Sequence, residues 1–594
     1  MGNDVYSWDD FNVYAAPDKL SSSDKEFESF NGGVKGKENG FYGVEDWGET
    51  GAVDSLRSDY EFYGDESMAA TGFGFSKQGL QQQQQQQSFT AYGLLDGLSF
   101  NAQSPLIPTP TCFSRMNDGV CNDIDETKKE KQQALCLPSL GLLNNYGNGF
   151  KRLHGKRRSD DDITVSDARD DEDRKFSTEE IMRIAGEMFI KSCGQTVDGS
   201  SMIDHPFNVC FSGLSDPEKR DAELAVLLLA AAEKIGCQQY ESASRLLKQC
   251  DYMSSKTGNP VQRVVYYFTQ ALGEKIERSS SKGLNWRPLF NIEKAMMSMN
   301  PTVLACHQEF PFAMVTQFAG IQAIVENVGQ AKKVHIIDLA IRHGVQWTIL
   351  MQALASRQHE CGLELFKITA VSTEEKALVE NTGKRLSSFA QSLGIPFAFN
   401  IVIVSDMLDL KEDLFEMDAE ESVVAYAAFT FRRLLVMPNR IENIMRVLRV
   451  INPCVMVVTE IEGNHNSPIF VNRFIEVLFF FSAYFDCSAT CMKQDTENRE
   501  IMESVFFGEG IRNMIASEGE ERKIRHVKFD VWRAFLVRYM MEETELSMSS
   551  MYQVDLILKS FACGTSCTLD MNGKTLLIGW KGTPMYSISV WKFL

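Results

Sequence analysis

Residues 334–347, VHIIDLAIRHGVQW, place polar side chains directly after an apolar run. Asp338 ends the run, and Arg342 and His343 follow it in the next few residues. The pattern predicts a buried strand, a turn and a helix, and in an open α/β sheet a cofactor binds at such a turn. The chemistry to weigh is therefore methyl transfer from S-adenosylmethionine in a crevice beside Asp338.

The composition of the turn argues against a bound cofactor. A cofactor loop needs glycine where its backbone approaches the ligand, but residues 341–343 are Ile, Arg and His. Gly344 is better placed as the entry to the next helix. A ribose-binding acid should end the following strand, and there the chain has Ser372 with Glu374 two residues later, a weak signal. We expect an emptied or repurposed crevice, no catalytic or cofactor-binding residue and no enzyme activity, with a retained methyltransferase as the alternative.

Other candidates for chemistry have simpler structural interpretations. His335 lies inside the apolar run, where a hydrogen-bonded core histidine is favoured over a catalytic one. Cys487 with Cys491, and Cys563 with Cys567, form two C-x3-C pairs. Zinc sites usually have tighter spacing, so we expect no metal site.

The segment LAVLL contains three leucines with two possible roles. Leu224, Leu227 and Leu228 follow the L-x-x-L-L pattern on a predicted helix. Such a helix can lay its apolar face into a partner's groove, and a symmetric pair of helices would form a dimer interface. The same spacing is also typical of a stripe facing the helix's own core. We favour the core stripe for the pattern itself. Leu224, Leu227 and Leu228 remain the candidate partner interface, because the apolar stripe of the first cap helices is wider than one edge of a domain is expected to cover.

The elements that must position these residues form an α/β pattern. Apolar runs such as KVHIID, LFKITAV and CVMVVTE alternate with helical segments, which predicts a mostly parallel sheet with helices on both faces. Asn572-Gly573 separates two alternating runs near the end and predicts a hairpin with a type I′ turn. The fold class is a methyltransferase-like, Rossmann-type mostly parallel sheet with an antiparallel C-terminal hairpin. An N-terminal helical cap precedes it, with a capping box predicted at Ser177 and Glu180.

Composition divides the 594 residues into three parts. Residues 1–175 are rich in Gly, Ser, Asn and Asp and include a run of glutamines at 81–87, so we predict disorder. We assign residues 176–328 to the helical cap and residues 329–594 to the α/β core. A formal net charge of −20 repels phosphate backbones, so contact with promoter DNA is expected to be weak or indirect. No secretory signal or membrane span is expected.

Two segments of the N-terminal part carry possible signals. The opening DVYSWDDFNVY interleaves acids with aromatic residues, a pattern of activation segments that is equally compatible with a solvated tail. The segment KRLHGKRR holds five cations and predicts a nuclear-import signal, with a charged linker as the alternative. Those five cations are Lys151, Arg152, Lys156, Arg157 and Arg158.

Several blocks, in order, resemble the plant-specific GRAS transcription regulators. VHIID (Val334, His335, Ile336, Ile337, Asp338) with HGVQW is similar to the family signature, and LLLAAAEKIG and FKITAVSTEEKALVENTGKRL resemble its two leucine-rich regions. The last block resembles the C-terminal Ser-Ala-Trp region, here Trp532, Trp580, Ser589, Val590 and Trp591, with Val590 replacing the alanine. The resemblance covers about residues 215–594.

The resemblance implies action in the nucleus as a transcription regulator. It also implies partners, namely other GRAS proteins as homo- or heterodimers and DNA-binding transcription factors. The DELLA branch is not expected, because residues 1–175 contain no hormone-receptor-binding motif of that branch. The segment STEEIMRIAGEMFI is loosely similar to a branch tied to arbuscular mycorrhizal symbiosis.

Overall fold

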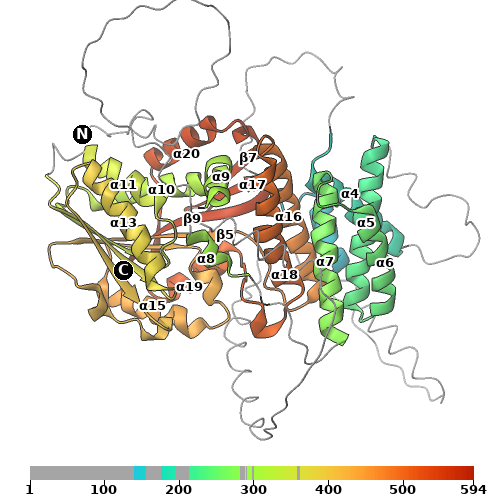
Figure 1. Ribbon diagram of the computed structural model, residues 1–594, viewed down its shortest axis with the longest axis horizontal. Helices are drawn as coiled ribbons and strands as arrows, with labels where there is room; N and C mark the ends of the chain where they lie inside the picture. Colours follow the sequence, from blue (N-terminus) through green and yellow to red (C-terminus); the bar gives the residue numbers. More distant parts are fainter. Residues whose placement is uncertain are drawn as a thin grey trace, which may run out of the picture.

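The computed structural model describes residues 139–154, 175–194, 213–280, 288, 290–297, 300–356 and 362–594 (Figure 1). The longer helices are α4 (Thr178–Gly194), α5 (Asp216–Gly236), α6 (Tyr240–Met253), α7 (Pro260–Ser280), α8 (Ile292–Met297), α9 (Pro301–Glu309), α10 (Pro311–Val328), α11 (Val345–Ser356), α13 (Lys376–Ser392), α15 (Pro438–Ile451), α16 (Phe470–Cys491), α17 (Thr496–Ile501), α18 (Glu509–Ile515), α19 (Phe529–Arg538) and α20 (Met548–Ser560). The strands are β1 (Lys333–Asp338), β2 (Leu365–Ser372), β3 (Phe397–Ile403), β4 (Ser422–Ala428), β5 (Val455–Ile461), β6 (Met541–Thr544), β7 (Cys567–Asn572), β8 (Thr575–Trp580) and β9 (Thr583–Phe593).

Within these residues nine strands form one sheet, with the order β3-β2-β1-β4-β5-β9-β8-β7 and β6 paired to β9. Strands β1 to β5 pair in parallel, and the pairs β5–β9, β9–β8 and β8–β7 are antiparallel. The strand order reverses between β1 and β4. This confirms the predicted fold class, a mostly parallel sheet that ends in antiparallel strands.

Helices cover both faces of the sheet, which explains why its central strands, such as β1 and β5, are buried along almost their whole length. Alternate residues of one strand enter two different cores, because successive side chains point to opposite faces. Ile336 joins the core beneath α10, α11, α16 and α20, whereas its neighbour Ile337 joins the core beneath α15 and α19. The same alternation holds in β5, where Val457 and Val458 belong to different cores.

The helical cap differs from the predicted segment 176–328. Helices α4 to α7 pack together, but α16 and α18, which come much later in the chain, pack against them (Figure 1). Helix α10, which we assigned to the cap, instead lies against α11, α20 and strands β5 and β9. Helical periodicity alone predicts a helix but not which layer it joins. The cap is therefore assembled from two separated stretches of sequence.

The predicted capping box at the start of the first cap helix is present in the structure. The Ser177 hydroxyl accepts from the Glu180 N–H at 3.2 Å, and the Glu180 carboxylate accepts from the Ser177 N–H at 2.8 Å, which is a capping box. Helix α5 ends at Gly236, and Pro260 is the first residue of α7.

Residues 139–154 lie inside the region predicted to be disordered, and here the structure differs from the prediction. Residues 139–147 are helical, and Leu143 and Tyr146 are buried. The Tyr146 ring stacks on Phe479 with centroids 3.9 Å apart. A few apolar residues in a polar region were enough to dock this segment, which regional composition does not detect. The poly-glutamine run and the acidic-aromatic segment lie outside the described residues.

The predicted C-terminal hairpin is present, but its turn is of a different kind. Asn572 pairs with Thr575, so the two loop residues are Gly573 and Lys574. Of these only Gly573 has a positive φ, 65°, which is the pattern of a type II′ turn. The type I′ pattern occurs in the following hairpin, where Lys581 and Gly582 have φ of 48° and 97°.

The predicted partner interface at the L-x-x-L-L segment is wrong for two of its three leucines. Leu224 and Leu228 are buried in the chain's own cap core, and Leu227 is half-buried against the same core. Helices α4, α6, α7 and α16 surround α5 and cover the stripe. The core interpretation holds because helices distant in sequence bury this face.

Among the described residues, α16 alone has the length and apolar composition of a membrane span, and 83% of its most apolar window is buried in the fold. That burial is typical of a core helix.

The leucines of α5 give a direct stability test. Leu228→Ala should lower the free energy of unfolding by about 2–5 kcal/mol, because it leaves a cavity in the cap. Leu227→Ala, one position away and half-buried, is the matched control and should have a smaller effect. Urea unfolding followed by circular dichroism measures both. Equal effects, or loss of self-association without loss of stability in Leu228→Ala, would restore the interface interpretation.

Candidate functional site

The candidate site lies beyond the carboxyl ends of β1, β4 and β5, where the strand order reverses. Ligands of open α/β sheets bind at such a switch point. Five functional-type side chains converge here from four segments: Asp338 from the end of β1, Arg342 and His343 from the loop after it, Tyr426 from β4, and Tyr586 from β9.

The acid predicted at the strand end is used to hold the adjacent helix. The side chain of Asp338 is buried, and its Oδ2 accepts from the Trp347 indole N–H at 2.9 Å. Its Oδ1 accepts from the Ala340 N–H at 3.2 Å. Burial raises the Asp338 pKa from 3.8 to about 6, against these hydrogen bonds, which lower it. Asp338 is therefore a structural acid that joins β1 to α11.

The loop after β1 folds inward and occupies its own crevice. Leu339 and Ile341 are buried, and Gly344 has φ of 77° immediately before α11 begins. A Cβ at Gly344 would lie 2.9 Å from Thr382 Cγ2, so glycine is required by α13 as well as by the backbone. Gly344 is the helix entry predicted from the sequence, and it serves helix packing.

A stack of cationic and aromatic groups lies at the crevice, and two of its members, Arg342 and Phe429, line it. The Arg342 guanidinium lies 4.9 Å from the Phe429 ring centroid, and the Arg432 guanidinium lies 5.3 Å from the same centroid. Phe429 has φ of 56°, a conformation that costs a non-glycine residue of the order of 1–3 kcal/mol. Its N–H donates to the Thr459 carbonyl at 2.7 Å, which fixes this backbone against β5. Sequence patterns gave no signal for Phe429, because the stack joins segments from different strands.

The remaining cavity is small. It has a volume of about 120 Å³, and its lining includes His307, His343 and Thr459. Pockets for drug-sized ligands are roughly 300–1,000 Å³, so a cofactor such as S-adenosylmethionine would require the loop to move. Burial lowers the pKa of His307 to about 4 and depresses that of His343 further, so both rings are neutral at physiological pH.

A buried polar network continues from the crevice towards α19. The Glu460 carboxylate accepts from the Phe431 N–H at 2.8 Å, and burial raises its pKa to about 7. Arg432 Nη1 lies 3.2 Å from His526 Nε2, and the Nδ1 atoms of His526 and His465 are 2.8 Å apart. The network ties β5 to the segment before α19 and was not predicted from the sequence.

The family-motif residues of β1 are structural. Val334, His335, Ile336 and Ile337 are fully buried. His335 Nδ1 lies 2.9 Å from Glu421 Oε2, and its Nε2 lies 2.7 Å from Thr369 Oγ1. Both ring nitrogens thus have partners, as expected of a core histidine. Burial, and then the nearby Lys367, lower its pKa to about 4.

The C-terminal motif residues are also core residues. Trp532, Trp580, Ser589, Val590 and Trp591 are each at most 2% exposed. Trp580 donates to Asp486 of α16 at 2.7 Å, and Trp591 donates to Ser589 Oγ at 2.9 Å. The side chains of these residues enter the cores on both faces of the sheet: Trp580 and Val590 join one core, and Trp532 and Trp591 join the other.

The predicted nuclear-import cluster is divided. Lys151 lies 3.6 Å from Glu476, and Arg152 contacts Glu179 and the Lys581 carbonyl. These two cations are therefore part of the docked segment 139–154. Residues 156–158 lie outside the described residues.

Another hollow lies at the amino ends of β4 and β5. This groove of about 1,020 Å³ is lined by residues at the starts of these strands and at the end of β9, and it includes Glu412, Asp413, Glu416 and Glu421. Its acidic lining is poorly suited to a phosphate backbone.

Comparisons with known proteins agree with this geometry. The model of the GRAS domain family matches residues 224–592. The DELLA protein GAIP of Cucurbita maxima is 28% identical over 384 residues, 64% of this chain and 64% of that protein. The DELLA protein RGL1 of Arabidopsis thaliana is 29% identical over 379 residues, 64% of this chain and 71% of that protein. The chain thus spans slightly under two thirds of the length of some of these relatives.

One solved structure shares the fold. The crystal structure of SCL7 of Oryza sativa superposes with a TM-score of 0.54 at 24% identity and covers 62% of this chain and 99% of that chain.

The raised pKa of Asp338 predicts a dependence of stability on pH. Its folded value, about 6, exceeds the unfolded value, so the folded state binds the proton more tightly between about pH 4 and 6. The free energy of unfolding of the wild-type chain should therefore fall by up to about 3 kcal/mol as pH rises through that window and Asp338 ionises. Asp338→Asn should lack this loss, and the exposed Asp216→Asn is the control. Parallel pH profiles of unfolding for wild type and Asp338→Asn would show that Asp338 does not titrate in this range.

Proposed function

Because this chain belongs to the GRAS domain family, we propose that it is a nuclear regulator of transcription that acts through association with other proteins. The observation that carries the proposal is the crevice at the end of β1. The chain's own Arg342 and Phe429 stack together in its lining, Asp338 is hydrogen-bonded to Trp347, and only about 120 Å³ remains open. A sheet that retains the methyltransferase plan while its crevice is this small supports use as a scaffold for binding.

Partners are part of the same proposal. We infer that the chain pairs with other GRAS proteins, as homo- or heterodimers, and with DNA-binding transcription factors. Leu224 and Leu228 are excluded as the contact, since they are buried in the cap. With a net charge of −20, contact with promoter DNA is expected to depend on such partners. Membership of a branch other than DELLA, and a link to mycorrhizal symbiosis, remain predictions from the sequence.

Binding of S-adenosylmethionine distinguishes the regulator from the alternative enzyme. Calorimetry with the full-length chain should give no saturable heat, which corresponds to a Kd weaker than about 1 mM. In parallel, the full-length chain tethered to a reporter promoter through a heterologous DNA-binding domain should change transcript output. Saturable binding together with transfer of a labelled methyl group would establish the enzyme instead, and an unchanged reporter would count against the regulator.

The divided basic cluster sharpens the test of nuclear import. Substitution of Lys156, Arg157 and Arg158 by Ala should leave a fluorescent fusion of this 67.0 kDa chain largely in the cytoplasm. Substitution of Lys151 and Arg152, which contact the fold, is the matched control and should preserve nuclear signal. Nuclear accumulation of the triple variant, or exclusion of the double variant, would refute this division of roles.

A further inference from the structure

The two C-x3-C pairs meet in space. Cys487 and Cys491 lie on the last two turns of α16. Cys563 lies in the connection from α20 to β7, and Cys567 is the first residue of β7. The sulfur atoms of Cys491 and Cys563 are 2.9 Å apart, and those of Cys487 and Cys491 are 3.7 Å apart. All cysteines in the described part of the chain are free thiols. No group of three or more His, Cys, Asp or Glu there is arranged to hold a metal ion.

We propose that Cys491 and Cys563 form a redox-modification site, at which a peroxide oxidises the two thiols to an intrachain disulfide. Two thiols 72 residues apart in sequence are already in contact, so the bond requires only a small approach of the sulfur atoms to about 2.05 Å. Neither side chain is used by the crevice at β1. The site is therefore distinct from the candidate functional site and goes beyond the proposed function.

The chemistry balances with the peroxide as sole oxidant. The Cys491 thiolate attacks one peroxide oxygen, the O–O bond breaks, and the departing hydroxide takes a proton to leave as water. This oxidises Cys491 to a sulfenic acid. The Cys563 sulfur then attacks the Cys491 sulfur, the S–O bond breaks, and the hydroxyl leaves as a second water with the Cys563 proton. Two thiols and one hydrogen peroxide thus give one disulfide and two waters.

Exposure decides which thiol reacts first. Cys491 is half-buried at the end of α16, whereas Cys487, Cys563 and Cys567 are buried. Hydrogen bonding to Cys487 raises the pKa of Cys491, and hydrogen bonding to Cys491 together with burial raises the pKa of Cys563. Both groups therefore rest as thiols at neutral pH. Oxidation should be slow there and should accelerate as pH rises, because the thiolate is the reacting form.

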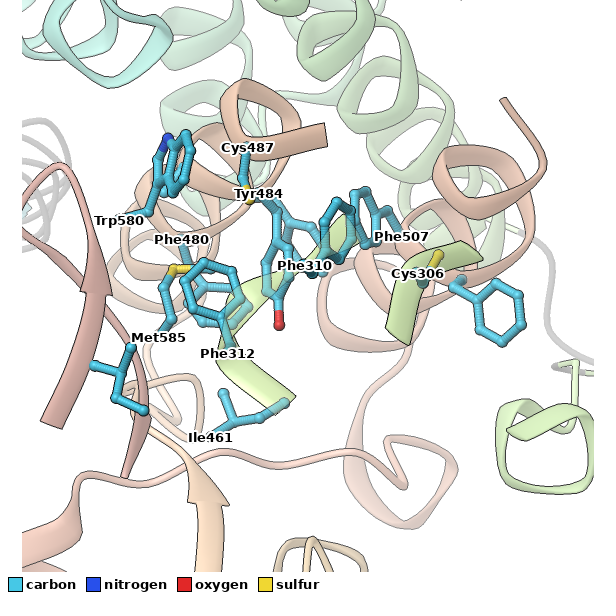
Figure 2. Packing of buried hydrophobic residues seen from close by; sticks show 14 of the residues in the cluster. Cys306, Phe310, Phe312, Ile461, Phe480, Tyr484, Cys487, Phe507, Trp580 and Met585 are labelled. Carbon is cyan, nitrogen blue, oxygen red and sulfur yellow. The ribbon is translucent and has the colours of Figure 1, made fainter. Parts of the chain in front are cut away.

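The disulfide would lock a junction that is already held by polar contacts. Asp486, next to Cys487 on α16, accepts from Trp580 Nε1 at 2.7 Å and pairs with Lys581 at 2.7 Å. Figure 2 shows Trp580 and Cys487 at the same edge of the aromatic cluster that joins α16 to the C-terminal strands. A disulfide at Cys491, one turn further along α16, would fasten this helix to the segment that leads into β7.

The test uses the full-length chain and hydrogen peroxide. After oxidation and alkylation of the remaining thiols, non-reducing digestion should yield a reducible peptide pair that joins the end of α16 to the segment before β7. The cross-link should form faster at about pH 9 than at about pH 7, following the thiolate fraction. Thermal unfolding of the oxidised chain should occur at a higher temperature, and dithiothreitol should reverse the shift.

Single substitutions identify the pair. Cys491→Ser and Cys563→Ser should each abolish the cross-link, whereas the matched controls Cys487→Ser and Cys567→Ser should retain it. Circular dichroism establishes that each variant is folded, and Cys→Ala replaces any Cys→Ser variant that is not. The proposal is overturned if wild type forms no cross-link, if the cross-link persists in Cys491→Ser, or if a co-purified metal ion protects the four thiols until a chelator removes it.

Discussion

Burial of α16 on all sides is the constraint on which the rest of the structure depends. This helix is the shared core of the cap and the sheet, because α4 and α7 pack on it from one side and β8 and β9 from the other. Aromatic contacts run in both directions. The ring centroids of Phe474 and Phe268 of α7 are 5.6 Å apart. Those of Tyr484 and Phe312 of α10 are 6.1 Å apart, and Figure 2 shows these two side chains. Neither layer could retain its position if α16 were withdrawn.

A helix so enclosed must also satisfy its polar side chains. Buried Arg473 donates to the Met514 carbonyl at 2.9 Å, Ser488 donates to Glu503 at 2.6 Å, and Asp486 accepts from Trp580. Glu503 in turn pairs with Arg263 of α7 at 2.8 Å. An unpaired buried charge would destabilise the fold strongly, so these partners fix the rotation of α16 relative to the cap. The cysteine pairs come together as a consequence of that fixed rotation.

In the crevice after β1 the polar side chains are likewise bonded to groups of the same chain. In an open sheet the strand ends offer backbone and side chains to a ligand, but here Asp338 holds Trp347 and Arg342 lies over Phe429. The polar groups at the end of β1 are thus bonded within the chain, and this is the observation on which the proposed scaffold role rests.

The sequence by itself determined the fold class, the parallel pairing of the apolar strands and the structural role of His335. Each of these follows from local periodicity and from the need to satisfy a buried ring. Only the tertiary structure decided which distant segments of the chain pack against one another. It placed Leu228 in the cap core, because helices far along the chain cover it, and docked residues 139–154 through Tyr146 on Phe479. It also joined Cys491 to Cys563, since a contact across 72 residues is set by packing and leaves no periodic trace in the sequence.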